Sequence, residues 1–385
     1  MPFADNRNKI GKYIPAVVFL IFIYGMALWF VFSPKPDYSS SEKRYLQKFP
    51  EVTAEKLLSG EFGSEFETFF ADRFPQRNTW VGLNAYTALA VGNNGASGVY
   101  NCKNGYLINK PVSTENNLDK NIGAVADFAK SIDTPTTVML VPSTGYIVDD
   151  VLPTFHDKYN DDEDISKIFS TLSKDKIGFV DLRERFKSEY KNGSQLYYKT
   201  DHHWTTKGAY TGYQELCKAL GITPIDDSTL KKDSYPDFYG TTYSSSGFWL
   251  TPPDNIEIWN NPKNSDRNIS VKITEGANIK TSGSMYFTDH LKEDDKYPVF
   301  IDGNHALTEI TNTNAKNGTI LLIKDSFSHS LAPFLAENYS KVVLVDLRYY
   351  KESVSDLVTT YNPEQVVVLY GIDNLATDTD IVWLK

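Results

Sequence analysis

The hydrophobic residues of this chain form one long uncharged run near the N-terminus and many shorter periodic runs after it. The long run covers residues 13–32, and twenty residues of helix span about 30 Å, the thickness of a bilayer core. Three basic residues and one acidic residue precede it. By the positive-inside tendency, these charges predict a cytoplasmic N-terminus and an exported remainder. The pattern therefore predicts one transmembrane anchor at residues 13–33.

A cleaved signal peptide is the alternative interpretation of the same run. The run is long for the apolar region of a signal peptide, and residues 33–36, Ser-Pro-Lys-Pro, do not form a small-residue cleavage site. We therefore expect an uncleaved anchor, with residues 1–12 in the cytoplasm. Residues 34–50 are rich in Pro, Ser and charge and are predicted to be a juxtamembrane linker. Residues 51–385 are predicted to form one extracytoplasmic domain.

The exported part begins with helical spacing over residues 51–91 and then alternates between strand and helix patterns. Short apolar, β-branched runs predict strands at 136–142, 176–182, 318–323, 341–347 and 365–371. Amphipathic runs predict helices at 118–132, 163–175, 207–221, 328–339 and 354–361. Apolar strands that alternate with helices indicate an α/β fold, a parallel sheet with helices on both faces.

Two further segments depart from this alternation. Residues 98–108 read as a hairpin whose turn is Lys-Asn-Gly. Residues 222–318 are rich in Gly, Pro, Ser, Asn and Tyr, and they predict a long β/loop insertion. The α/β core is then discontinuous, with one part at 119–221 and the other at 319–385.

Composition narrows the class of protein. Hydrophobic residues make up 41% and charged residues 23%, which excludes a disordered chain or a coiled coil. The net charge is -10, which argues against nucleic acid as a partner. Two cysteines are too few for a disulfide scaffold or a four-cysteine zinc site. The 24 tyrosines suit either a carbohydrate-facing surface or ordinary β packing.

The first segment whose residues could carry out a reaction is Lys324-Asp325-Ser326-Phe327, which lies between a predicted strand and a predicted helix. A serine in such a turn lies at the C-terminal edge of the sheet, where open α/β sheets bind their ligands. The helix N-terminus directs unpaired N–H groups and partial positive charge to the same place. Ser326 is therefore a candidate nucleophile. The alternative is that Ser326 or Ser328 merely caps the helix.

The second segment is the run Asp-His-His-Trp-Thr at residues 201–205. A serine nucleophile needs an imidazole to accept its proton and a carboxylate to orient that imidazole. His203 and Asp201 can supply these two groups. One alternative is a metal site made of Asp201, His202 and His203, although three ligands so close in sequence strain a tetrahedral site. The other is that the histidines are structural, with their hydrogen bonds satisfied inside the fold.

The third segment, Gly371-Ile372-Asp373-Asn374, follows the last predicted strand. Glycine permits close approach of the backbone, and the Asn374 amide could donate a hydrogen bond to an oxyanion. Alone, this segment also reads as an ordinary Asn-containing turn.

Together these motifs resemble the DHHW family of exported bacterial proteins, which is related to the SGNH-hydrolase-like O-acetyltransferases of the alginate type. The segments that carry the resemblance are 99–108, 201–205, 238–247, 300–310, 321–335 and 346–350. The DxH motif precedes the serine, as in the circularly permuted SGNH arrangement. The resemblance implies an SGNH-hydrolase-like α/β fold, a serine nucleophile and no cofactor or metal.

Carried over by position, the resemblance makes Ser326 the nucleophile, His203 the base and Asp201 its orienting acid. The backbone N–H of Ser326 and the amide of Asn374 are the implied oxyanion donors, and Asn304 is the rival donor. Lys324 replaces the glycine that SGNH hydrolases commonly have before Asp-Ser. Further candidates for substrate binding are Tyr239, Tyr243, Lys324 and Trp204.

The implied activity is the transfer of acetyl groups to a cell-surface or secreted polysaccharide. The resemblance also implies a multi-span membrane acyltransferase as the partner that delivers the acetyl donor. Two alternatives remain open at this point, because the triad is common to transferases and hydrolases. One is a polysaccharide O-acetylesterase, and the other is a non-catalytic protein that binds or assembles polysaccharide.

Overall fold

The computed structural model describes residues 3–113 and 117–384, with side chains from residue 11 onward. The chain divides into two compact units, Met1–Tyr86 and Thr87–Lys385. We call them the N-terminal unit and the C-terminal unit.

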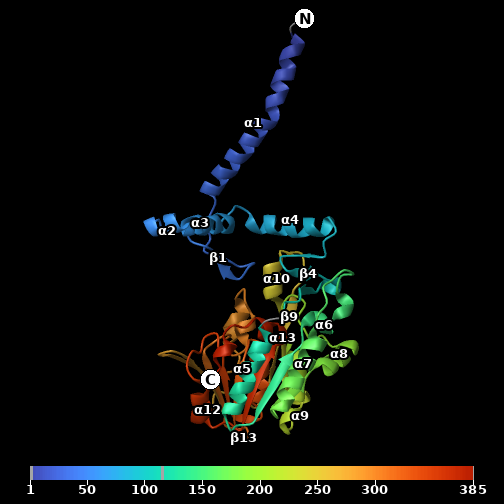
Figure 1. Cartoon of the computed structure of the whole chain (residues 1–385), viewed down its shortest axis with the longest axis vertical. Helices are drawn as coiled ribbons and strands as arrows, with labels where there is room; N and C mark the ends of the chain where they lie inside the picture. Colours follow the sequence, from blue (N-terminus) through green and yellow to red (C-terminus); the bar gives the residue numbers. More distant parts are fainter. Residues whose placement is uncertain (1–2, 114–116, 385) are drawn as a thin grey trace. The chain divides into compact units, whose positions relative to one another are not determined.

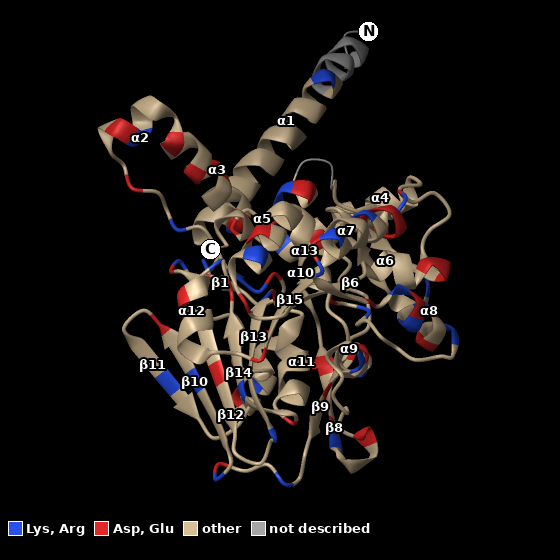
Figure 2. Cartoon of the chain, turned by 60° about the horizontal axis from the view of Figure 1, so that its bottom comes forward, with Lys and Arg blue, Asp and Glu red and all other residues tan. Residues whose placement is uncertain are grey.

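The N-terminal unit is helical. Its helices are α1 (Phe3–Phe32), α2 (Ala54–Ser59), α3 (Glu61–Asp72) and the first part of α4 (Arg77–Ala90), with a short hairpin of β1 (Tyr38–Ser39) and β2 (Arg44–Tyr45). Within α1, Gly11–Phe32 is long and apolar enough to cross a membrane. Figure 2 shows α1 without charged residues beyond Lys12. This helix overlaps the anchor predicted at residues 13–33, and its length and composition fit either an anchor or a signal sequence.

The boundary between the units falls after Tyr86, whereas the sequence placed the start of a domain at residue 51. The helices after residue 51 are connected by hydrogen bonds to the segment that follows α1. The buried guanidinium group of Arg73 donates hydrogen bonds to the carbonyls of Lys35 and Pro36, both at 2.8 Å. The predicted limits of linker and domain therefore remain predictions, and α3 belongs with the N-terminal unit.

Among the described residues, the C-terminal unit is built on an eight-stranded sheet in the order β11-β10-β12-β14-β13-β15-β6-β7 (Figure 1). Its strands are β6 (Thr136–Val141), β7 (Gly178–Asp181), β10 (Ile269–Glu275), β11 (Asn278–Ser282), β12 (Leu307–Asn312), β13 (Asn317–Lys324), β14 (Tyr339–Val345) and β15 (Gln365–Gly371). The strands from β14 to β7 run parallel, and β12, β10 and β11 are antiparallel additions.

Helices cover both faces of this sheet, because successive residues of its buried strands point to opposite sides. In β6, Val138 and Leu140 pack in one core cluster and Met139 and Val141 in the other. One face is covered by α5 (Leu118–Ser131), α7 (Asp161–Lys174), α12 (Val354–Tyr361) and α13 (Ile372–Thr377). The other face is covered by α9 (Thr206–Leu220) and α11 (Ser328–Leu335). The predicted α/β fold is confirmed.

The segment 222–318 contributes more to the core than an irregular insertion would. Its strands β10 and β12 pair with each other, and β12 pairs with β14, so they extend the main sheet. In β10, buried residues alternate with more exposed polar ones. This one-sided burial is typical of antiparallel strands near a sheet edge. Such strands alternate apolar with polar residues, so they lack the continuous apolar run of the parallel strands.

Smaller elements surround this core. They are the sheet of β3 (Gly95–Ala96), β4 (Val99–Asn101) and β5 (Leu107–Asn109), the pair β8 (Lys231–Phe238) and β9 (Asp254–Asn260), and helices α6 (Thr144–Ile147), α8 (Arg183–Lys191) and α10 (Thr241–Ser246). The antiparallel pairing of β4 with β5 matches the hairpin predicted at 98–108.

Helix α9 can start where it does only because Gly208 has no side chain. A Cβ at this position would overlap the carbonyl oxygen of Leu196 and lie 2.9 Å from the Cβ of Trp204. We expect Gly208→Ala to lower the free energy of unfolding by about 1–3 kcal/mol, the usual cost of overpacking. The measurement is denaturant unfolding, with Gly123→Ala as the matched control. Gly123 lies in α5, where an added Cβ would meet no atom within 4 Å, so this control should be neutral or stabilising. Equal destabilisation by both changes would contradict the packing account.

Candidate active site

Ser326 lies in the turn between β13 and α11, which we call the nucleophile turn because Ser326 is the candidate nucleophile. The carboxylate of the preceding residue organises this turn. The carboxylate of Asp325 accepts hydrogen bonds from the backbone N–H of Phe327 at 2.9 Å and of Gly371 at 2.7 Å. The Asn374 amide donates to the same carboxylate at 2.7 Å. Burial raises the pKa of Asp325, and these three donors oppose that effect. The turn after β13 is thus fastened to the end of β15.

The serine side chains of this turn do not cap α11. The N-cap residue is Phe327, and no side chain makes a capping hydrogen bond there. The hydroxyl of Ser328 donates to the carbonyl of Asp325 at 2.9 Å. Neither Ser326 nor Ser328 therefore caps α11 with its side chain.

The loop at 201–205 lies against this turn, and Trp204 joins the two. Its indole N–H lies 2.9 Å from the carbonyl oxygen of Phe327 and 2.9 Å from the hydroxyl of Ser330. Trp204 is fully buried. The hydroxyl of Thr205 accepts a hydrogen bond from the Gly208 N–H at 3.1 Å and caps α9. The loop therefore ends at the residue that directly follows Trp204.

Three side chains from these segments form a continuous hydrogen-bonded chain. The Ser326 hydroxyl lies 2.7 Å from His203 Nε2, and His203 Nδ1 lies 2.5 Å from Asp201 Oδ1. The Ser326 residue is 8% exposed, whereas His203 and Asp201 are 4% and 2% exposed. With the imidazole proton on Nδ1, His203 Nε2 can accept the serine proton. The arrangement can therefore activate Ser326 as a nucleophile.

Asp201 is held as a carboxylate by its surroundings. Its Oδ2 accepts hydrogen bonds from the backbone N–H of Thr241 at 2.7 Å and from the hydroxyl of Thr241 at 3.1 Å. Burial alone would raise the pKa of Asp201, but His203, His202 and these donors hold it well below its usual range. The neighbouring Gly240 has no room for a side chain, because a Cβ there would overlap Asp201. Asp201 is thus ionised and fixed in position.

Tyr297 contacts both ends of the Ser326–His203 pair, and the sequence reasoning missed it. Its ring stacks on the His203 imidazole, with centroids 3.9 Å apart and an interplanar angle of 10°. Its hydroxyl donates to the backbone carbonyl of Ser326 at 3.1 Å. Tyr297 comes from the 222–318 segment, in a run without any recognisable motif. Only its contacts in the folded structure show that it packs against His203 and binds the Ser326 backbone. Thr241 lies in a segment that the family resemblance did mark, 238–247, although no role was assigned to it.

His202 lies beside the chain of three residues but outside it. Its Nδ1 lies 2.7 Å from the Thr241 hydroxyl, and its ring centroid lies 3.8 Å from that of His203. Burial and then the neighbouring His203 lower the pKa of His202 to about 4. His202 is therefore neutral at ordinary pH.

The same residues could hold a metal ion by their chemistry. Potential ligand atoms of Asp201, His202 and His203 lie within 4.8 Å of one another. Both ring nitrogens of His203, however, are already in hydrogen-bond contact with Asp201 and Ser326. A metal ion at His203 would have to displace one of those two contacts.

The two candidate oxyanion donors differ in position. Asn374 lies beside the nucleophile turn, where one N–H of its amide binds Asp325 and the second is available. Asn304 lies at the surface, and its side-chain oxygen accepts a hydrogen bond from Arg348 at 2.9 Å. Only Asn374 is bonded to the turn that carries Ser326, so its position favours it as the donor.

Two of the four candidate substrate residues are buried, which corrects the sequence interpretation. Trp204 is fully buried and bonded as described above. Lys324 is 2% exposed, and its ammonium group lies 2.9 Å from Asp346 Oδ2 and 2.8 Å from His329 Nε2. Burial lowers the pKa of Lys324, and the charge of Asp346 opposes that effect. Neither side chain reaches a surface where substrate could bind.

The other two, Tyr239 and Tyr243, form a half-buried aromatic group. Their ring centroids lie 4.4 Å apart, and the Tyr243 ring is 5.2 Å from that of Trp249. Tyr243 lies in α10, whose first residue, Thr241, binds Asp201. We call these three rings the aromatic group of α10.

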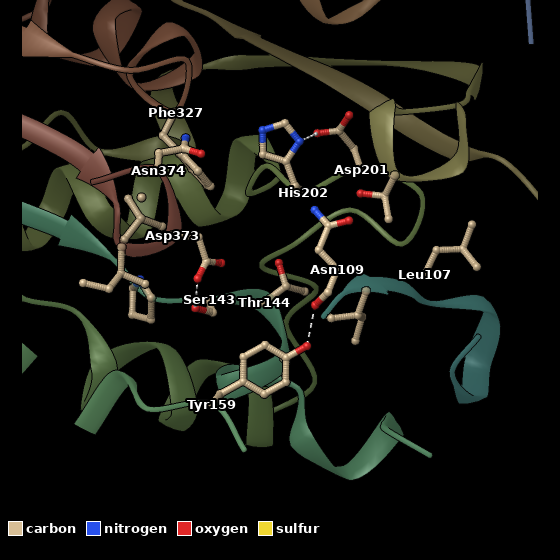
Figure 3. Close-up of a pocket in the computed structure, with 17 residues that line it drawn as sticks. Leu107, Asn109, Ser143, Thr144, Tyr159, Asp201, His202, Phe327, Asp373 and Asn374 are labelled. Carbon is tan, nitrogen blue, oxygen red and sulfur yellow. Dashed lines mark hydrogen bonds and ion pairs between the residues drawn. The ribbon is translucent and has the colours of Figure 1, made fainter. Parts of the chain in front are cut away.

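A pocket opens at the C-terminal edge of the parallel strands, next to the nucleophile turn (Figure 3). Its volume is about 60 Å³. Phe327, Asn374 and His202 line one side, and Ser143 and Tyr159 line the other. A volume of this size admits a few water molecules or a small acyl group, not a long acyl chain.

Fold and geometry together define an α/β protein with a serine–histidine–aspartate chain at the edge of its sheet. A family model described as DHHW protein matches residues 99–345. The chain therefore belongs to the DHHW family. No similar curated protein was found by sequence comparison.

Several solved structures are similar to this chain. A DHHW family protein from Eubacterium siraeum has a TM-score of 0.63 at 17% identity, covering 75% of this chain and 95% of its own. PatB1 from Bacillus cereus, solved with a sulfonyl adduct, has a TM-score of 0.61 at 20% identity, covering 74% and 97%. The O-acetyltransferase domain of Pseudomonas putida AlgJ has a TM-score of 0.48 at 14% identity, covering 75% and 95%. The first two likenesses support the fold described here.

The Lys324–Asp346 pair should be a structural support for the nucleophile turn. The two side chains are only 2% and 1% exposed, and Arg348 binds the same carboxylate at 2.6 Å. Asp346→Asn leaves the Lys324 charge buried without its counter-charge, so we expect a loss of about 3–5 kcal/mol in the free energy of unfolding. Denaturant unfolding measures this loss. The exposed pair Lys292–Asp289 is the control, and Asp289→Asn should have no measurable effect.

The same variant predicts a change in pH dependence. Burial would raise the pKa of Asp346, but Arg348 and Lys324 lower it overall. The stabilisation from Asp346 is therefore complete above the unfolded pKa of about 4 and is lost as the pH falls through the lowered folded value. Asp346→Asn should flatten that part of the stability profile. An unchanged profile would contradict this assignment.

Proposed function

We propose that this protein is an extracytoplasmic, membrane-anchored O-acetyltransferase that acetylates a polysaccharide through an acetyl-serine intermediate. The observation that carries the proposal is the hydrogen-bonded chain from Ser326 through His203 to Asp201. Membership of the DHHW family and the resemblance of that family to alginate-type O-acetyltransferases support the choice of acetyl transfer.

In the first half of the reaction, His203 Nε2 takes the Ser326 proton while Ser326 Oγ attacks the carbonyl carbon of an acetyl ester. The Asn374 amide and the Ser326 backbone N–H stabilise the oxyanion of the tetrahedral intermediate. Asp201 stabilises the imidazolium that forms. The bond to the donor alcohol then breaks, and the alcohol leaves with the proton from His203. Acetyl-Ser326 remains.

In the second half, a sugar hydroxyl gives its proton to His203 and attacks the acetyl group. The bond to Ser326 Oγ breaks, and Ser326 takes the proton back from His203. The products are an acetylated sugar and the free enzyme. If water attacks instead, the products are acetate and free enzyme, so the same groups would perform an esterase reaction.

Two surfaces of the C-terminal unit support the choice of a small acyl group and a sugar acceptor. The 60 Å³ pocket beside Asn374 suits acetyl better than a longer chain. The aromatic group of α10 offers apolar ring faces with polar edges, which suits the C–H faces and hydroxyls of a sugar ring. We assign Tyr239 and Tyr243 to acceptor binding on this basis.

The anchor supplies the cellular setting of the proposal. With the N-terminus cytoplasmic, Gly11–Phe32 would span the membrane and the C-terminal unit would lie outside the cell. No cytoplasmic acetyl donor reaches that side directly. We therefore propose that a multi-span membrane acyltransferase supplies the acetyl group and that the acceptor is a cell-surface or secreted polysaccharide.

Ser326→Ala should abolish both hydrolysis of a chromogenic acetyl ester and acetyl transfer to an oligosaccharide acceptor. The expected loss is about 10³-fold or more, because the other groups cannot replace the nucleophile. Release of the chromophore and mass spectrometry of the acceptor measure the two activities. Ser340→Ala is the matched control. Ser340 lies at the start of β14, at the N-terminal ends of the parallel strands, whereas Ser326 lies at their C-terminal ends. In the described contacts, the Ser340 hydroxyl donates only to the Gly318 carbonyl, at 3.0 Å.

The outcome separates the three classes of function. Acetylated oligosaccharide that depends on Ser326 supports the transferase. Acetate release without acetylated acceptor would replace it by an esterase. Glycan binding without turnover, unaffected by Ser326→Ala, would overturn both and favour a binding or assembly protein.

A further inference from the structure

The N-terminal unit carries an apolar surface that no described residue covers. The exposed large apolar residues of this surface are Phe49, Val52, Leu57, Leu58, Phe66, Phe70, Trp80 and Leu83. Leu58 is 90% exposed. Ring contacts through Phe69 and Phe30 join Phe49, Phe66 and Phe70 of this set, and exposed apolar surface that is contiguous marks an interaction site. We call it the apolar surface of the N-terminal unit.

This surface is continuous with the outer end of the predicted span. Phe30, two residues from the end of α1, contacts Phe70 with ring centroids 4.7 Å apart and Phe69 at 6.2 Å. From there, further phenylalanine contacts follow α3 to Phe66 and Phe62. If α1 crosses the bilayer, Phe30 lies at its outer interface. The apolar stripe of α3 must then begin at the same depth.

A second set of contacts fixes α3 at this depth. The Arg73 side chain, at the end of α3, binds the carbonyls of Lys35 and Pro36 just after the span. It also donates to the carbonyl of Gln47 at 2.8 Å. Figure 1 shows α2, α3 and the start of α4 running across the C-terminal end of α1 rather than parallel to it. These helices therefore lie in the plane that a membrane surface would occupy.

We propose that α2, α3 and the start of α4 lie on the outer leaflet of the membrane and insert this apolar surface into its interfacial layer. The inference rests on the membrane anchoring included in the proposed function. Amphipathic helices bind membranes in this way through their apolar face, and Trp80 is of a residue type enriched at the interface. The occupant of the surface is thus lipid rather than a second copy of the chain.

The charges on these helices fit binding by apolar burial rather than by attraction to anionic lipid. The acidic residues Glu61 and Glu65 of α3 pair with Lys56 at 3.1 and 2.7 Å. Asp72 is buried and paired with Arg44 at 2.5 Å. The polar side of α2 and α3 therefore offers no free basic cluster among these residues, and insertion should depend little on salt.

The test uses the full chain in phosphatidylcholine vesicles, with single cysteines carrying a nitroxide label. Phe66→Cys and Leu58→Cys report on the apolar surface, and Ser64→Cys is the matched control. Ser64 is exposed, and two residues along the same helix place it away from Phe66. Both native cysteines are buried, and the unsubstituted chain gives the background. Leu58→Cys removes a side chain with little packing, so it guards against misfolding of Phe66→Cys.

The ratio of oxygen to nickel-complex accessibility should be severalfold higher at positions 58 and 66 than at 64, and insensitive to salt. Equal, water-like ratios at all three positions would overturn the proposal. Labels at 58 and 66 that are immobile and shielded from both agents would also overturn it, in favour of a protein partner or second copy. A further label, Phe22→Cys in α1, tests the span itself. A lipid signal there with water-like signals at 58 and 66 refutes only the interfacial helices, whereas a water signal at 22 refutes the anchor.

Discussion

The site depends on one buried contact between two segments that are far apart in the sequence. The Trp204 indole N–H lies 2.9 Å from the Phe327 carbonyl, and these residues are 123 positions apart. A buried N–H without a partner costs free energy, so this contact strongly favours one placement of the two loops. His203 and Ser326, the neighbours of these two residues, are thereby brought within 2.7 Å. The chemistry of the two loops is therefore a consequence of how they pack.

The sheet and the 222–318 segment complete the site from two directions. The parallel strands end at the turn of Ser326 and at Gly371, and the Asp325 carboxylate joins these ends. From the other side, Thr241 holds Asp201 and Tyr297 covers His203. The segment that looks least regular in the sequence thus supplies the residues that hold His203 and Asp201, the proposed base and its orienting acid. Rigid surroundings of this kind are what precise proton transfer requires.

The sequence predicts the parts of the molecule whose signals are local. The buried parallel strands such as β15 and β13 are nearly continuous apolar runs, and the predicted strand 365–371 has the bounds of β15. The Asp-His-His-Trp and Lys-Asp-Ser-Phe motifs identify Asp201, His203 and Ser326, which the structure brings together.

The residues that sequence reasoning misplaced or missed act through contacts that no local pattern encodes. Lys324 looks like a surface cation, but its strand places it inside, where Asp346, 22 residues away, balances its charge. Tyr297 stands in an unremarkable run and acquires its place only when the 222–318 segment folds over the loop. The pairing of β10 and β12 with the main sheet has no local signal in the sequence, because β10 buries only one face and the buried strand β12 contains the polar residues Thr308, Glu309 and Asn312.

The central claim is that Asp201 and His203 activate Ser326 for attack on an acetyl ester. Rapid-quench mass spectrometry of the full chain with an acetyl ester measures how fast acetyl appears on Ser326. The account predicts acetyl-Ser326 in the wild type, formed about 10³–10⁴-fold more slowly in Asp201→Asn, because the amide favours the wrong imidazole tautomer. Acetylation at another residue, or at equal rates in the two proteins, would contradict it.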